Sequence, residues 1–198
     1  MVFIVAGSHT LRDHAPSADR TSSYDSEVAI ESARLFADTD QPFSQALQVV
    51  TETPPHLVLV SQSVQPPPHS RIAVPPLPGD VDLLVRRTSY VHRGSVLSRH
   101  VSFVFESALA PRIMIALHEA TMDLSDVAAM GGVRKLDFSF GRAGTQDEVD
   151  EAIFEGFGED GFVSEFVWRR YVGMVGGTSA FVILEALPAD LSAVIGRG

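Results

Sequence analysis

The chain ends in two predicted strands, residues 167–172 and 178–188, joined by a Gly-Gly turn. Strand alternation places Glu185 in a row of apolar side chains on one face of the second strand. Its neighbours in that row are Phe181, Ile183 and Leu187. A carboxylate in such a row is costly unless a partner or a reaction uses it. Glu185 is therefore a candidate catalytic residue with a tuned pKa.

Two pairs of adjacent arginines, Arg86-Arg87 and Arg169-Arg170, also lie within predicted strands. Adjacent strand residues point to opposite faces, so one guanidinium of each pair is expected on or near the packed face. A buried guanidinium needs a counter-ion or a bound anion, and its forked donors suit carboxylates. An exposed basic face or a structural Arg–Glu pair is the alternative. Together with Glu185, the two pairs favour an anion pocket within the sheet.

Other chemistry lacks its sequence signature. The chain has no cysteine, and its seven histidines show neither HExxH nor paired i, i+4 spacing. No G-x-S-x-G elbow is present, and the glycine pairs are not part of a phosphate-binding loop. We therefore expect no metal site.

The composition predicts one packed domain. The chain has 198 residues, 45% of them hydrophobic, and a net charge of −10, which argues against nucleic acid as the main partner. No apolar run approaches the roughly 20 residues that cross a membrane, and the N-terminus lacks a basic leader. We expect a cytoplasmic monomer or homodimer that binds no membrane. Residues 1–26 are expected to be a poorly ordered segment and residues 27–198 a single domain.

The acidic residues are concentrated in one short stretch, which is predicted to be a solvated helix or flap because its spacing matches no calcium loop. They are Asp147, Glu148, Asp150, Glu151, Glu155, Glu159 and Asp160. Whether residues 141–162 close over the pocket is left open.

The remaining elements alternate between strands and short helices. Helices are predicted over 25–37, from the Asp38-Thr39-Asp40 cap to the Pro54-Pro55 pair, from Pro111 and from Asp123. Strands are predicted over 57–64, 83–91, 96–105 and 133–140, with residues 92–95 as a hairpin turn. Consecutive hairpins with inserted helices indicate an α+β domain: a single antiparallel sheet flanked by helices.

The order of these motifs resembles the chorismate pyruvate-lyase family and its wider superfamily, which includes ligand-sensing (UTRA) domains of bacterial transcription regulators. The resemblance covers roughly residues 35–190. It is carried by the motifs Leu84-Val85-Arg86-Arg87, Leu109-Ala110-Pro111, Asp123-Leu124-Ser125, Trp168-Arg169-Arg170-Tyr171 and Leu184-Glu185-Ala186-Leu187-Pro188.

The resemblance implies an internal ligand pocket and a cofactor-free elimination of pyruvate from chorismate, leaving 4-hydroxybenzoate. The family's ligand-binding arginine falls on Arg86, with Arg87 as the one-residue alternative, and its active-site glutamate falls on Glu185. The substrate-binding residues expected on this basis are Arg86, Arg87, Leu124, Ser125 and Arg170. Asp123-Leu124-Ser125 stands where the family has a Pro-Leu-Gly turn. The added Cβ and acid would narrow the pocket and repel a dianion.

Three functions follow from this sequence. The first is a lyase acting on chorismate or a close analogue. The second is a cyclase or pericyclase of secondary metabolism on the same fold, in which Arg86 pairs with protein acids. The third is a non-catalytic small-molecule-sensing module. The third is weakened because no helix-turn-helix precedes the domain, whose N-terminal segment is short and acidic.

Overall fold

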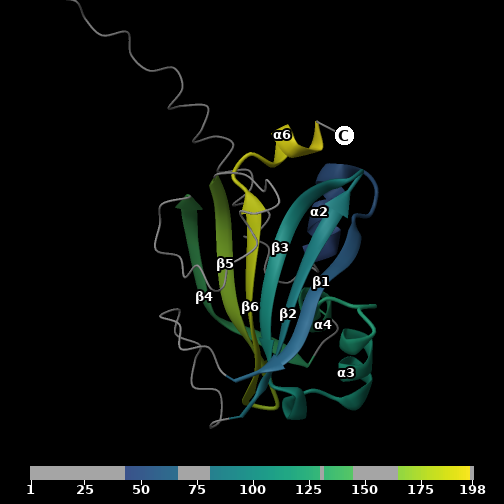
Figure 1. The fold of residues 1–198 in the computed structure, drawn as a ribbon. Helices are drawn as coiled ribbons and strands as arrows, with labels where there is room; N and C mark the ends of the chain where they lie inside the picture. Colours follow the sequence, from purple (N-terminus) through teal and green to yellow (C-terminus); the bar gives the residue numbers. More distant parts are fainter. Residues whose placement is uncertain (1–42, 67–80, 130–131, 145–164, 197–198) are drawn as a thin grey trace, which may run out of the picture.

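The computed structural model describes residues 43–66, 81–129, 132–144 and 165–196 (Figure 1). The expectations for residues 1–26 and for a helix over 25–37 fall outside the described residues, as does the acidic stretch. The described helices are α2 (Phe43–Thr51), α3 (Pro111–His118), α4 (Leu124–Ala129) and α6 (Leu191–Ile195), with a 3-10 turn at Glu106–Ala108. None of these helices is long and apolar enough to cross a membrane.

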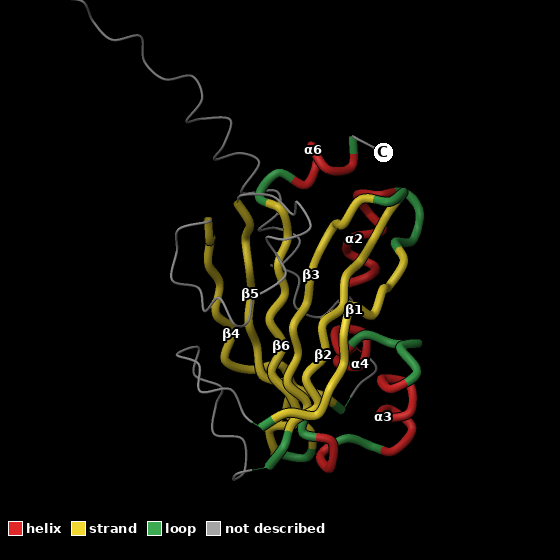
Figure 2. Tube along the Cα trace, viewed as in Figure 1, coloured by secondary structure: helices red, strands yellow, loops and turns green. Residues whose placement is uncertain are grey.

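The described strands form one six-stranded antiparallel sheet in the order β1-β2-β3-β6-β5-β4. The strands are β1 (His56–Gln65), β2 (Leu83–His92), β3 (Ser95–Val104), β4 (Val133–Gly144), β5 (Glu165–Val175) and β6 (Thr178–Pro188). Strands β1 and β4 form the two edges (Figure 2). The α+β architecture predicted from the sequence is confirmed.

Two hairpins have tight turns because their turn residues adopt positive φ. Arg93 and Gly94, between β2 and β3, have φ of 47° and 83°, and Gly176 and Gly177, between β5 and β6, have 59° and 87°. Positive φ at both central residues is what a type I′ turn requires, and its twist matches that of the flanking strands. The turn after β2 is shorter than the predicted residues 92–95 because His92 and Ser95 already belong to the ladder.

The helices cover one face of the sheet. Leu117 of α3 and Leu124 of α4 pack with Tyr171 and Ile183 of the sheet, and Phe43 of α2 packs in a neighbouring cluster. Figure 1 shows α2, α3 and α4 on the same side, with α6 at one end. The other face carries a separate apolar cluster, which includes Val101 and Leu184.

Candidate functional site

A row of polar side chains crosses the helix-covered face. Thr88, His100, Glu185 and Arg169 lie directly opposite one another on β2, β3, β6 and β5. All four are buried, and none is more than 3% exposed. Four buried polar groups in one row need partners within the protein or a ligand.

Glu185 is held by two donors from β5. Its Oε2 accepts a hydrogen bond from Arg169 Nε, and its Oε1 accepts one from the Tyr171 hydroxyl at 3.4 Å. Burial, reinforced by the nearby Glu185 charge, raises the pKa of Tyr171 well above its usual value, so Tyr171 remains a donor at neutral pH. The sequence prediction that Glu185 is buried is confirmed. Its partner is Arg169, the arginine that we did not choose.

The other end of the row is organised by Asp123, in the loop before α4. Its Oδ2 accepts a hydrogen bond from the Thr88 hydroxyl at 2.8 Å, and its Oδ1 lies 3.4 Å from His100 Nδ1. His100 Nε2 lies 3.2 Å from the Ser98 hydroxyl. Burial lowers the pKa of His100, but the Asp123 charge and hydrogen bond outweigh it, so the pKa is raised overall. Asp123 is thus fully buried yet paired.

Arg86 lies next to this row and also faces the helices. Its Nε donates to Gln62 Oε1 at 2.9 Å, and its Nη2 donates to the Met122 carbonyl at 3.4 Å. The residue is fully buried, and its Nη1 makes no hydrogen bond with any described residue. Burial lowers the pKa of Arg86, and the charge of Asp123 opposes that effect. One donor of a buried guanidinium is therefore available to a ligand.

The row, together with Arg86, Asp123 and Asp126, forms a polar layer. Helix α2 is tied to this polar layer through Asp126 of α4. Asp126 accepts hydrogen bonds from the Ser44 hydroxyl at 2.8 Å and from the Tyr90 hydroxyl at 3.2 Å. The Phe43 ring packs against His100 at a centroid distance of 4.9 Å and beneath the Arg169 guanidinium at 5.5 Å. Helix α2 therefore covers the row and contributes its aromatic wall.

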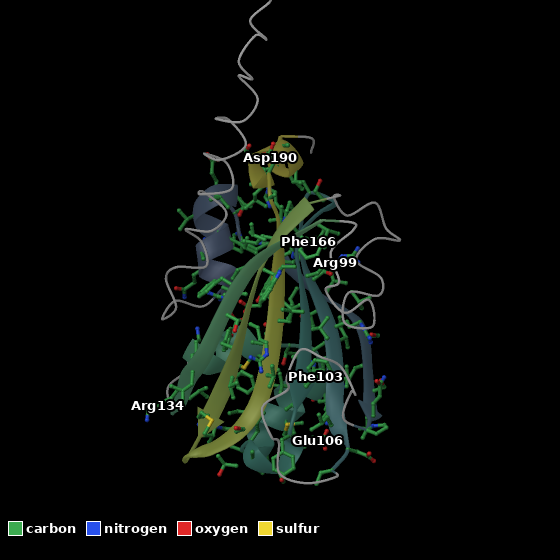
Figure 3. The ribbon with its side chains drawn as sticks, turned by 90° about the vertical axis from the view of Figure 1, so that its left-hand side faces the viewer. Arg99, Phe103, Glu106, Arg134, Phe166 and Asp190 are labelled. Carbon is green, nitrogen blue, oxygen red and sulfur yellow. The ribbon has the colours of Figure 1, made fainter. Side chains whose placement is uncertain are left out.

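Two of the predicted substrate-binding arginines lie on the opposite face. Arg87 is the Cα partner of Val101, and Arg170 is the Cα partner of Leu184, both members of the apolar cluster away from the helices. Figure 3 shows Arg99 and Phe103 on that same side of the sheet, away from α2. Arg86 and Arg87 are thus separated, and Arg86 is the one that shares a face with Glu185.

The predicted turn residues divide in a similar way. Leu124, the first residue of α4, is buried in the apolar cluster that α3 and α4 form with the sheet. The side chain of Ser125 is outside the described part of the structure. Sequence reasoning missed the roles of Thr88, His100, Asp123 and Arg169. The signal available was the acid in Asp123-Leu124-Ser125, which we expected to repel a ligand and which Thr88 and His100 instead satisfy.

Within the described ranges, no group of three histidine or carboxylate side chains is arranged to hold a metal ion. The layer offers hydrogen bonding, charge and proton transfer. Its described ionic groups are the cations Arg86 and Arg169, the titratable His100, and the carboxylates Asp123, Asp126 and Glu185.

Comparison with known proteins identifies relatives of the fold only. No protein-family model and no curated protein matches the sequence. PhnF from Mycobacterium smegmatis has a similar structure, with 14% identity over 76% of this chain and a TM-score of 0.52. The matched region spans 64% of that protein, which is less than two thirds of its length.

Two further structures have related topology. One is the effector domain of PhnF from Mycobacterium smegmatis, with 12% identity, a TM-score of 0.49, and coverage of 77% of this chain and 90% of that one. The other is the ligand-binding domain of a protein assigned to the GntR family of transcriptional regulators, from Bordetella bronchiseptica. It has 9% identity, a TM-score of 0.49, and coverage of 69% and 86%. At this level of identity the likeness to PhnF concerns the fold alone.

Proposed function

We propose that this domain binds a small organic anion in the polar layer between the sheet and helices α2 and α4, as a sensing module. The observation that carries the proposal is the Arg86 guanidinium. It is fully buried, and its Nη1 has no hydrogen-bond partner among the described residues. A buried donor of this kind is costly to leave unsatisfied, and a carboxylate oxygen is its best match.

The surrounding charges favour a single carboxylate over a dianion. Asp123 acts on Arg86 electrostatically, and Glu185 already has Arg169 as its partner. A ligand carboxylate on Arg86 Nη1 would therefore be near one cation that is only partly compensated. The fold likeness to PhnF supports a sensing role, because one of the neighbouring structures is the effector domain of that protein.

The binding of 4-hydroxybenzoate tests the ligand class. Isothermal titration with 4-hydroxybenzoate, benzoate and the neutral 4-hydroxybenzamide separates charge from shape. We expect both carboxylates to bind and the amide to bind at least about tenfold more weakly, because it cannot form the charge-assisted hydrogen bond. Equal affinity for the acid and the amide would overturn the assignment of an anion site.

A cofactor-free lyase remains the second candidate, and the Tyr171–Glu185–Arg169 contacts favour it. A carboxylate and a protonated phenol in a buried layer could orient a ring hydroxyl and move a proton. Incubation with chorismate, followed by measurement of pyruvate and 4-hydroxybenzoate, tests this function. Release of both products by wild type that is lost in Glu185→Gln, with circular dichroism showing the variant still folded, would favour the lyase. Binding without release would favour the sensor.

The cyclase hypothesis expects Arg86 to pair with protein acids. Among the described residues Arg86 instead donates to an amide and a carbonyl oxygen, and Asp123 acts on it through its charge. We therefore rank a cyclase behind the other two functions.

A further inference from the structure

Ser98, His100 and Asp123 form a chain of contacts in the polar layer, of which the proposed ligand site uses only the charge of Asp123. The Ser98 hydroxyl lies 3.2 Å from His100 Nε2, and His100 Nδ1 lies 3.4 Å from Asp123 Oδ1. Ser98 and His100 are two residues apart on β3, so both point to the same face. Thr88 completes the chain by donating to the second oxygen of Asp123 at 2.8 Å.

The contacts assign a role to each nitrogen of His100. In the neutral form of His100, which forms above its raised pKa, donation of Nδ1–H to Asp123 leaves Nε2 as the acceptor for the Ser98 hydroxyl. This is the order of groups found when a histidine base activates a serine and a carboxylate orients the histidine. Such contacts are often long before a substrate binds and shorten in the reacting complex.

The imidazole ring is also fixed from its sides. The Phe43 ring lies at 4.9 Å and the Tyr90 ring at 5.4 Å from the His100 ring, both edge to face. Edge-to-face packing limits rotation of the imidazole, so the two nitrogens keep their partners. A base that is held by a carboxylate and two rings is preorganised for proton transfer.

We propose that Ser98 is a nucleophile for small activated esters, with His100 as general base and Asp123 as its orienting carboxylate. Ser98 Oγ attacks the ester carbonyl carbon, and its proton moves to His100 Nε2. The carbon–oxygen bond to the leaving group then breaks, and that oxygen takes the proton from His100. Water, activated by the same base, hydrolyses the acyl-serine, releasing a carboxylic acid and restoring Ser98.

Access to Ser98 requires movement of α2, since Ser98 is fully buried and Phe43 packs on its partner His100. The test therefore uses wild type, Phe43→Ala and the milder Phe43→Leu. Each is treated with diisopropyl fluorophosphate, and mass spectrometry locates the modified serine. Circular dichroism checks that each variant retains its strands. Ser98→Ala, His100→Gln and the same-strand control Ser102→Ala are then made in whichever of these three proteins labels fastest.

We expect a phosphoryl adduct on Ser98, formed faster in the Phe43 variants. Labelling should be absent in Ser98→Ala, at least tenfold slower in His100→Gln and unchanged in Ser102→Ala. The proposal fails if Ser98 is unlabelled in all three folded parent proteins, or if His100→Gln does not change the rate at which Ser98 is labelled. Titration of Ser98→Ala with 4-hydroxybenzoate separates this proposal from the sensor proposal. Because Arg86 is intact in this variant, the sensor proposal expects 4-hydroxybenzoate still to bind.

Discussion

Arg169 lies directly opposite Glu185 in the ladder between β5 and β6 and donates its Nε hydrogen to the glutamate. Both side chains are buried, with exposures of 1% and 0%. The pair explains how an acid is tolerated in an apolar row. It also means that the glutamate is already engaged before any ligand arrives.

Removal of one member of this pair should be strongly destabilising. Glu185→Gln leaves the Arg169 charge buried without its counter-ion, which typically costs about 3–5 kcal/mol. Urea unfolding measures the loss. The double variant Arg169→Met, Glu185→Leu removes both charges and should lose less stability than Glu185→Gln alone. A single variant as stable as wild type would show that the pair is not coupled.

The closeness of Gly173 to Phe181 gives a second prediction. A Cβ added at Gly173 would lie 2.2 Å from Phe181 Cζ, and the Phe181 ring is fully buried. Gly173→Ala should therefore destabilise the domain by about 1–3 kcal/mol through overpacking. Thermal unfolding of Gly173→Ala and of Gly173→Ala, Phe181→Leu measures the effect. The smaller side chain should recover part of the loss, and no recovery would contradict this account of the contact.

The raised pKa of His100 predicts the pH dependence of stability. A histidine whose folded pKa lies above its usual 6.5 contributes stability that is complete below that value. The contribution disappears as the pH rises through the higher folded pKa. Asp123, Glu185 and Arg169 are the charged groups that act on His100. The free energy of unfolding should fall as the pH rises above 6.5 in wild type, and less in His100→Gln. Parallel curves for the two proteins would refute the assignment.

Attachment of α2 should depend on Asp126. Ser44→Ala and Tyr90→Phe each remove one donor to that carboxylate, at a typical cost of about 1 kcal/mol. Hydrogen exchange at the amides of residues 43–51 should become faster in both variants, while the exchange of β6 should change little. A uniform acceleration over the whole domain would instead indicate a global loss of stability.

Sequence reasoning predicted the elements better than their register. The hairpin over residues 83–105, the helix from Pro111 and the burial of Glu185 follow from local patterns and are confirmed. Which of Arg169 and Arg170 shares a face with Glu185 depends on an irregularity between Gly173 and Met174, which shifts the register of β5 by one residue against β6. Counting back from the turn without that shift would place Trp168 opposite Glu185, and no periodicity in the sequence shows the shift.

The loop before α4 shows a second limit. From the sequence we expected Asp123 to repel a ligand, because its partners Thr88 and His100 lie on strands that are far from Asp123 along the chain. Pairing of β2 with β3, and the placement of α4 over the sheet, bring those side chains together. Long-range packing of this kind cannot be read from spacing along one segment.

The adjacent residues Arg86 and Arg87 provide the sharpest test of whether Arg86 anchors a ligand carboxylate. Arg86→Gln and its matched control Arg87→Gln change the same chemistry on opposite faces of β2. In titrations with 4-hydroxybenzoate, the affinity of Arg86→Gln should be at least about tenfold lower than that of wild type, because a charge-assisted hydrogen bond is lost. The affinity of Arg87→Gln should change little. Equal affinities for the two variants, or a greater loss in Arg87→Gln, would contradict the claim.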